Sequence, residues 1–228
     1  MYRANASYIV KILRAKGYSI DNNRINQVLK EVGFAMSEPK KWHSKKWIGY
    51  EREHSNSLWH VDWHEIKDPR KGLWLIVYED DSSRFIVCYG VYPTPTFKYS
   101  VDVLMKAISM YGKPEEILSD HGTTFYAVES DEREKGLLEF EKFLIKEKIT
   151  LIVGRVNHPQ TNGKVEKFFD IFEKKVKFFN SADEFMYWYN FIRPHGAFDI
   201  EKLESPAVIF YQRLPKNEII EQSFFDML

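Results

Sequence analysis

The fold is decided by residues 58–66, L-W-H-V-D-W-H-E-I, a run of apolar, aromatic and β-branched residues that predicts a strand. Two runs of the same kind follow it closely, L-W-L-I-V-Y-E-D and R-F-I-V-C-Y-G-V-Y. The polar segments D-P-R-K-G and D-D-S-S separate the three runs and are typical of turns. We therefore expect three neighbouring antiparallel strands.

Helices and strands alternate after this meander. The pattern predicts a helix over about 97–111, a short strand E-I-L-S-D, a helix over 137–147 and a strand over 150–153. A long helix begins after His158. Ser181 and Glu184 can cap a helix over 182–191, and Ser205 with Pro206 can begin another. This order predicts an α/β protein with a mixed sheet flanked by helices.

The N-terminal 35 residues predict two short helices. Ile9, Ile12 and Leu13 share one face of the first helix, which ends at Gly17. Asp21 can cap the second helix, over 22–32, and the following apolar residues form its stripe: Ile25, Val28, Leu29 and Val32. The pair is either part of a helix-turn-helix or two docking helices with no role in DNA binding, because a helix-turn-helix normally needs a third helix.

The charge is distributed unevenly along the chain. The whole sequence has 33 basic and 33 acidic residues, but residues 1–50 hold ten Lys or Arg against three acids, about +7, so the remainder is about −7. Residues 36–53, which include K-K-W-H-S-K-K-W, are therefore expected to be a basic linker. A basic front end would bind DNA phosphates even though the net charge is zero.

The composition, 44% hydrophobic, predicts a globular core, and neither a signal peptide nor an 18-residue apolar run is present. We expect an intracellular protein, cytoplasmic and associated with the nucleoid, with no membrane contact. The single cysteine, Cys88, lies in an apolar run and is expected to pack in the core, as are Trp59 and Trp63.

Three carboxylates break the local pattern around them. Asp62 lies in mid-strand between Val61 and Trp63, Asp120 ends the short strand, and Glu166 lies on the first turn of the long helix. Each has an ordinary alternative. Asp62 could be a strand-edge or turn-facing acid, Asp120 a turn residue, and Glu166 a solvated residue stabilised by the helix dipole.

On the long helix, the following apolar residues share one face and form a stripe: Val165, Phe168, Phe169, Phe172, Val176 and Phe179. Glu166 is about 110° from the centre of this stripe, so it borders the core without entering it. Two strand-borne aspartates and one helix-borne glutamate suit Mg²⁺ or Mn²⁺, which prefer hard oxygen ligands. Two ions, about 3.5–4 Å apart, would bridge a scissile phosphate and support phosphoryl transfer.

These residues occur in motifs that resemble a known family. The order V-D-W, S-D-H-G-T-T-F, H-P-Q-T-N-G-K-V-E-K-F, N-F-I-R-P-H-G-A-F and S-P-A is similar to the catalytic core of insertion-sequence transposases in the retroviral integrase superfamily. The resemblance covers about residues 54–213. It implies a ribonuclease-H-like fold with a mixed five-stranded sheet, and a DDE motif made of Asp62, Asp120 and Glu166 as catalytic residues and metal ligands.

The resemblance also implies DNA contacts around the three acids. Side chains that could hold phosphates are Gln160, Thr161, Asn162, Lys164, Lys167 and His121. Lys167 could equally be a solvated lysine, and His121 an ordinary turn histidine. Structural hydrogen bonding is the preferred interpretation of His158, Arg193 and His195.

The chain departs from the family pattern in two places. The spacing between Asp120 and Glu166 is longer than usual, and the polar segment 127–136 is the expected surface insertion. The N-terminal segment matches only the final part of a helix-turn-helix. The expected domains are a partial helix-turn-helix over 1–35, a basic linker over 36–53, an integrase catalytic core over 54–195, and a C-terminal helix and tail over 196–228.

The resulting expectation is an insertion-sequence transposase or integrase that carries out DNA integration, recombination and transposition. It would cleave a strand at each transposon end with a divalent metal and transfer that end into target DNA, as a homo-oligomer on DNA. Two alternatives stay open: a ribonuclease-H-like nuclease that cuts without joining, and a catalytically inactive DNA-binding remnant of a transposase.

Overall fold

The structure is a computed structural model that describes residues 6–34, 51–67, 72–119, 139–153 and 163–215. Most of the predicted linker, the predicted insertion and the end of the predicted tail therefore lie outside the described residues. Within the described ranges, no helix is both long and apolar enough to cross a bilayer.

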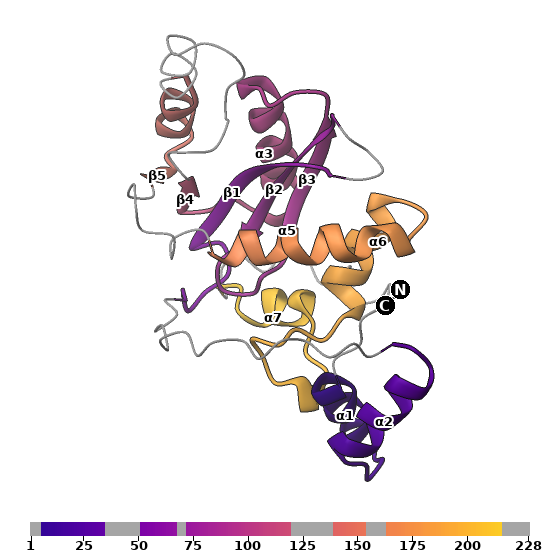
Figure 1. The fold of residues 1–228 in the computed structure, drawn as a ribbon. Helices are drawn as coiled ribbons and strands as arrows, with labels where there is room; N and C mark the ends of the chain where they lie inside the picture. Colours follow the sequence, from indigo (N-terminus) through magenta and orange to yellow (C-terminus); the bar gives the residue numbers. More distant parts are fainter. Residues whose placement is uncertain (1–5, 35–50, 68–71, 120–138, 154–162, 216–228) are drawn as a thin grey trace.

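A five-stranded sheet forms the centre of the protein (Figure 1), in the order β3-β2-β1-β4-β5. Its strands are β1 (Leu58–Glu65), β2 (Trp74–Asp80), β3 (Ile86–Tyr92), β4 (Glu116–Ser119) and β5 (Thr150–Val153). The first three are antiparallel neighbours, and β4 and β5 continue the sheet in parallel with β1. The prediction of a mixed five-stranded sheet is confirmed, and β1 is its central strand.

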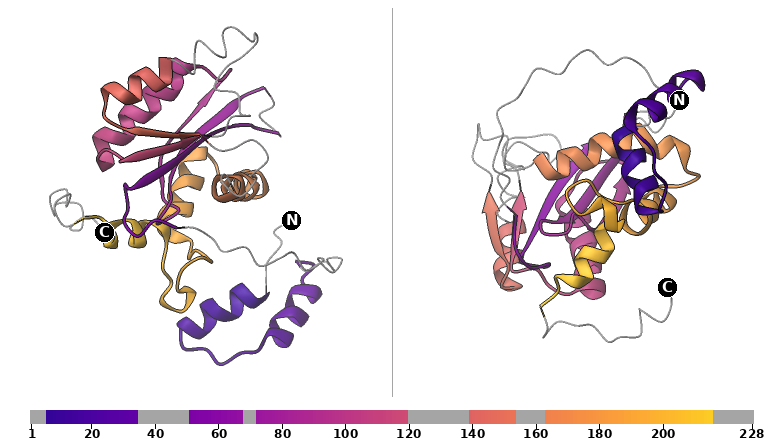
Figure 2. Two further views of the ribbon diagram at one scale, coloured as in Figure 1. Left: turned by 90° about the vertical axis from the view of Figure 1, so that its left-hand side faces the viewer. Right: turned by 90° about the horizontal axis from the view of Figure 1, so that it is seen from below.

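Helices cover both faces of the sheet (Figure 2). On one face lie α3 (Phe97–Tyr111) and a helical segment over 139–146; on the other lie α5 (Gly163–Lys175) and α6 (Ala182–Tyr187). Successive side chains of β1 point to opposite faces of the sheet, so some contact the layer that contains α3 and the others contact the layer that contains α5. Trp59, Val61 and Trp63 are buried in the core with α3, which confirms the two tryptophans as core residues.

The other face of β1 carries His60, Asp62 and His64. Their partners across the β1–β2 pairing include Val77 opposite Asp62 and Leu75 opposite His64. Directly paired residues project from the same face of a sheet. Val77 and Leu75 belong to the core cluster that contains the apolar stripe of α5, so this polar row of β1 faces α5.

The predicted helix over 182–191 is divided in two. Ser181 caps α6 by accepting a hydrogen bond from the Glu184 N–H at 3.1 Å, as predicted, but the Glu184 carboxylate accepts from the Asn180 N–H at 2.8 Å. The chain then widens into the π-helical segment η2 (Trp188–Ile192). After the short 3-10 helix η3 (Ile200–Lys202), α7 (Pro206–Gln212) packs into the core cluster of α3 through Ala207 and Phe210, with Ser205 at its N-cap as predicted.

The two N-terminal helices are α1 (Ala6–Ala15) and α2 (Asn22–Glu31), and Asp21 caps α2 as predicted. Their predicted buried faces are partly wrong. The core between them consists of Ala6, Val10, Ile25 and Leu29. Val28 and Val32 are 37% and 53% exposed, because a pair of helices shields only the strip between them. Helix α1 contacts η3, and the Tyr8 hydroxyl donates to the Pro194 carbonyl at 2.7 Å.

Candidate active site

Asp62 is buried in the middle of the central strand, with 5% of its surface exposed. One of its carboxylate oxygens accepts a hydrogen bond from the Trp63 N–H at 2.7 Å. The alternative of a strand-edge or turn-facing acid is wrong, because β1 has a neighbour on each side. A buried carboxylate is costly unless it is paired or coordinated. Its burial in the central strand distinguishes Asp62 from an ordinary surface acid.

The strand that leads to Asp120 lies directly beside Asp62. Strand β4 pairs with β1 in parallel, and the register places Ser119 opposite Val61. Asp120 and Asp62 each follow one of these paired residues in the sequence. Asp120 itself lies outside the described residues, as do four of the residues predicted to contact DNA: His121, Gln160, Thr161 and Asn162.

Glu166 occupies the first turn of α5, as predicted, and is exposed. The apolar stripe beneath it is buried, with Val165, Phe168 and Phe172 each 0% exposed. Glu166 is thus outside the buried stripe of α5. Lys167, next to it, is exposed and its Nζ is 3.3 Å from an Asp170 oxygen.

Helix α5 is attached to the far end of β1 through His64. The His64 ring stacks on Phe169 with 4.6 Å between ring centroids, and its Nε2 is 2.7 Å from the Glu173 carboxylate. The same carboxylate accepts a hydrogen bond from the Lys67 N–H at 3.1 Å. These contacts fix the middle of α5 against the end of the strand.

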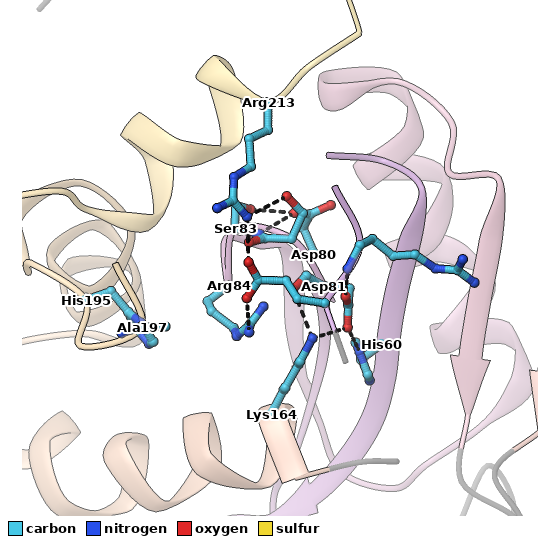
Figure 3. Close-up of polar contacts among 12 residues, drawn as sticks. His60, Asp80, Asp81, Ser83, Arg84, Lys164, His195, Ala197 and Arg213 are labelled. Carbon is cyan, nitrogen blue, oxygen red and sulfur yellow. Dashed lines mark hydrogen bonds and ion pairs between the residues drawn. The ribbon is translucent and has the colours of Figure 1, made fainter. Parts of the chain in front are cut away.

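A second attachment holds the start of α5. Asp81, just after β2, is 2.6 Å from His60 Nε2 and 2.5 Å from Lys164 Nζ (Figure 3). On β1, Asp62 lies between His60 and His64; on α5, Glu166 lies between Lys164 and Phe169. Two links therefore join β1 to α5, one through Asp81 and one through His64. They lie on either side of Asp62 along the strand and on either side of Glu166 along the helix.

Asp81 belongs to a group of buried acids at the end of β2. Burial raises the pKa of Asp81, but hydrogen bonds from His60, Lys164 and the Arg52 N–H outweigh that effect and hold its pKa below the usual range. Asp80 accepts hydrogen bonds from the Ser83 hydroxyl and N–H and from the Asn56 N–H. No local pattern indicated these contacts, since D-D-S-S is an ordinary turn composition.

Arg193 and His195 both contact neighbouring groups of the protein. His195 Nδ1 accepts a hydrogen bond from the Ala197 N–H at 3.2 Å, and burial together with Arg193 and Arg84 lowers the pKa of His195 to about 3. The Arg193 guanidinium lies over the Tyr189 ring, 5.4 Å from its centroid. For His195 the preferred interpretation, structural hydrogen bonding, is confirmed.

The described part of the chain holds two of the three carboxylates predicted to bind metal. No group of three His, Cys, Asp or Glu side chains that could hold a metal ion occurs within it. The donors that it does hold, one buried and one exposed carboxylate on facing elements, are of the hard oxygen type that Mg²⁺ and Mn²⁺ prefer. The residues present therefore fit a divalent cation.

Sequence comparison finds an integrase core domain in this chain. Residues 52–159 match the family model described as "Integrase core domain". The transposase for transposon Tn552 of Staphylococcus aureus is 29% identical over 136 residues, which are 52% of this chain but only 26% of that transposase. An uncharacterized protein of Archaeoglobus fulgidus is 30% identical over 112 residues, 49% of this chain and 86% of that protein.

Solved structures of retroviral integrases have the same fold. The catalytic core domain of HTLV-2 integrase, solved in complex with magnesium, has a TM-score of 0.53 at 18% identity, over 70% of this chain and 99% of that one. The core domain of BIV integrase has a TM-score of 0.51 at 18% identity, over 69% of this chain and 95% of that one.

A simian T-cell lymphotropic virus intasome, solved with PP2A regulatory subunit B56 gamma, contains a chain with a TM-score of 0.55 at 15% identity, over 90% of this chain and 71% of that one. This chain belongs to the integrase core domain family, with the ribonuclease-H-like core that transposases and retroviral integrases share.

Proposed function

We propose that this chain is a DNA transposase or integrase whose catalytic residues are Asp62, Asp120 and Glu166. The observation that carries the proposal is the burial of Asp62 in the central strand, on the face toward α5, where two contacts bracket Asp62 and Glu166 alike.

The three carboxylates would together hold Mg²⁺ or Mn²⁺, with two ions at the site. The HTLV-2 integrase core solved with magnesium supports this choice of metal. A divalent cation bound there would neutralise charge on the scissile phosphate and favour deprotonation of the attacking oxygen. The backbone of Asp62 is held in place by its own pairing with Val77 of β2 and by the pairing of the preceding residue, Val61, with Ser119 of β4.

The proposed reaction has two steps of the same kind. In the first, a water oxygen attacks a phosphorus atom at the transposon end, and the bond to the 3′-oxygen breaks to leave a 3′-hydroxyl and a 5′-phosphate. In the second, that 3′-hydroxyl attacks a target phosphodiester, a new bond forms to the target phosphorus, and a target 3′-oxygen leaves. Neither step needs a covalent enzyme intermediate.

The residues proposed to position DNA are Gln160, Thr161, Asn162 and Lys167, at the start of α5 or just before it, and His121, which follows Asp120. Lys164, also predicted for this role, has its ammonium bonded to Asp81. Among them Lys167 is exposed beside Glu166. Action at two transposon ends would require more than one copy of the chain, and the dimeric and trimeric forms of the HTLV-2 core support a homo-oligomer on DNA.

The test is a strand-cleavage and joining assay with duplexes that carry the sequences flanking the gene, one of them with a recessed 3′-hydroxyl. In Mg²⁺ or Mn²⁺ we expect nicked and joined products from the wild-type chain. Asp62→Asn and Glu166→Gln should each lower cleavage by about 10²–10³ at unchanged DNA affinity. Asp170→Asn, which changes an exposed carboxylate on the same helix, is the matched control and should cleave normally.

The products separate the alternatives. Cutting without joining would indicate a nuclease. DNA binding in the presence of chelator, with no cleavage in either metal at any protein concentration, would indicate an inactive DNA-binding protein and overturn the proposal. Wild-type cleavage by Asp62→Asn would remove Asp62 from the mechanism.

A further inference from the structure

Asp81 is a buried acid near the candidate site whose side chain has three partners from three different parts of the chain. Its side chain is 2% exposed, and it is contacted by His60 Nε2 at 2.6 Å, Lys164 Nζ at 2.5 Å and the Arg52 N–H at 2.7 Å. Its carbonyl accepts a second hydrogen bond from Lys164 at 3.2 Å, and its N–H donates to the Leu58 carbonyl at 2.9 Å. One residue thus joins β1, α5 and the segment before β1.

The partners of Asp81 stand in a fixed relation to the proposed catalytic residues. His60 precedes Asp62 by two positions on β1, so both side chains project from the same face of the strand. Lys164 precedes Glu166 by two positions in the first turn of α5. A shift of that turn along or away from β1 would therefore break a contact to Asp81.

Stability alone explains this arrangement poorly. The Lys164 side chain is 18% exposed, so its ammonium has given up most of its hydration to reach Asp81. Buried ion pairs generally contribute little net stability, because the loss of hydration offsets the attraction between the charges. Their best-attested role is to specify one arrangement of the elements that they join.

We propose that Asp81 is a positioning residue that fixes the first turn of α5 against β1, through Lys164 and His60, and so sets the distance from Glu166 to Asp62. The inference rests on the proposed function for its catalytic consequence. Asp81 itself would touch neither DNA nor metal. It would act only by holding two elements in place.

The first experiment is kinetic and uses the full chain with Asp81→Asn, a substitution that keeps the shape and removes the charge. At saturating DNA we expect the rate of strand cleavage to fall at least about tenfold, because small displacements of catalytic groups are costly. The DNA concentration for half-maximal rate should stay within about twofold of wild type. Asp170→Asn is the control, since its ion pairs lie within α5 and do not reach the sheet.

The second experiment needs no activity. It measures hydrogen–deuterium exchange without metal or DNA at the amides of Lys167, Phe168 and Phe169, which donate to carbonyls of the first turn in an α-helix. Asp81→Asn should speed exchange at these amides. The amides of residues 172–175, beside the Glu173 contact to His64, should exchange as in wild type. Faster exchange at both sets would show a general loss of stability and overturn the proposal.

A double-mutant comparison tests the route of the effect. Lys164→Met, at a partly exposed site, should lower the cleavage rate by itself, and adding Asp81→Asn should cause little further loss, because both changes break one link. Fully additive losses would overturn the action of Asp81 through Lys164. Lys164→Met also provides a variant with the link broken if Asp81→Asn does not fold.

The experiments distinguish failure of the proposed function from failure of the positioning role of Asp81. If the wild-type chain neither cleaves nor joins DNA, the proposed function fails, while the exchange experiment still tests Asp81. If the wild-type chain cleaves and Asp81→Asn matches it in both rate and exchange, the positioning role fails and the proposed function stands.

Discussion

At the scale of single residues, Glu79 is a buried acid whose surroundings strongly oppose its ionisation. It lies on β2 opposite His60, and burial raises its pKa to about 8 although Arg84 and Lys164 act in the other direction. In the unfolded chain this pKa returns to about 4.5. Between these two values the folded protein binds more protons at Glu79 than the unfolded protein does. The contribution of Glu79 to stability is therefore full below about pH 4.5 and is lost as the pH rises through 8.

We expect Glu79→Gln, which cannot ionise, to be more stable relative to wild type as the pH rises, with a gain of at least about 1 kcal/mol at alkaline pH. The measurement is the free energy of unfolding in urea at pH 5, pH 7 and pH 8.5. Asp80, whose pKa is raised to about 6, is present in both proteins. Glu65→Gln, at an exposed glutamate of β1, is the control. A difference that does not change with pH would contradict this prediction.

The two acids Asp62 and Asp81 show how far sequence reasoning reaches at this scale. Asp62 could be singled out because an ionised group between Val61 and Trp63 violates the chemistry of a strand. Asp81 could not be singled out in this way, because an acid is an ordinary residue in a turn. Its partners His60 and Lys164 are 21 and 83 positions away, and only the folded chain brings them together.

At the scale of elements, the sequence predicted strands better than the ends and buried faces of helices. Strand β5 was placed at its observed bounds, and the three strands of the meander pair as expected. The helix predicted over 182–191 instead changes to the π-helical segment η2. There the side chain of buried Asn190 makes two hydrogen bonds with the backbone of Ile86 at the start of β3, as a neighbouring strand would. Such a contact depends on residues 104 positions apart, so no local pattern could reveal it.

Asn190 provides the prediction at this scale. Its side chain accepts a hydrogen bond from the Ile86 N–H and donates one to the Ile86 carbonyl, both at 2.9 Å. Asn190→Ala would leave two buried backbone groups without these partners, so we expect a loss of about 2–4 kcal/mol in unfolding free energy. Asn180→Ala, at an exposed asparagine, should lose less than about 1 kcal/mol. Equal losses in chemical denaturation would show that the Asn190 contacts contribute little.

At the scale of the whole molecule, the chain has a basic N-terminal part, residues 1–50 (the front), and an acidic remainder (the body). The helices α1 and α2 lie apart from the sheet (Figure 1) and touch the body through η3 and Pro194. Residues 1–50 carry about +7 of formal charge, whereas the remainder carries about −7. If the chain binds DNA as proposed, its affinity should come mainly from the front, since phosphate contacts require cations and an acidic body repels them.

The last prediction tests this division with two sets of four Lys→Gln substitutions. The first set removes charge from the front, at residues outside the described part of the chain: Lys40, Lys41, Lys45 and Lys46. The second is the control and removes exposed lysines from α3 and the helix beside it: Lys98, Lys106, Lys142 and Lys146. Each lysine that contacts a phosphate contributes about 0.9 to the slope of log affinity against log salt concentration.

We expect the first set to reduce that slope by up to about 3–4, and the second set to leave it nearly unchanged. Fluorescence anisotropy with a labelled duplex, from about 50 to 200 mM salt, measures the slope directly. Thermal unfolding of both variants checks that each is folded. Because the two sets remove the same charge, any difference between them reports where DNA lies and not the change in net charge. An equal reduction by both sets would place DNA on the body as much as on the front.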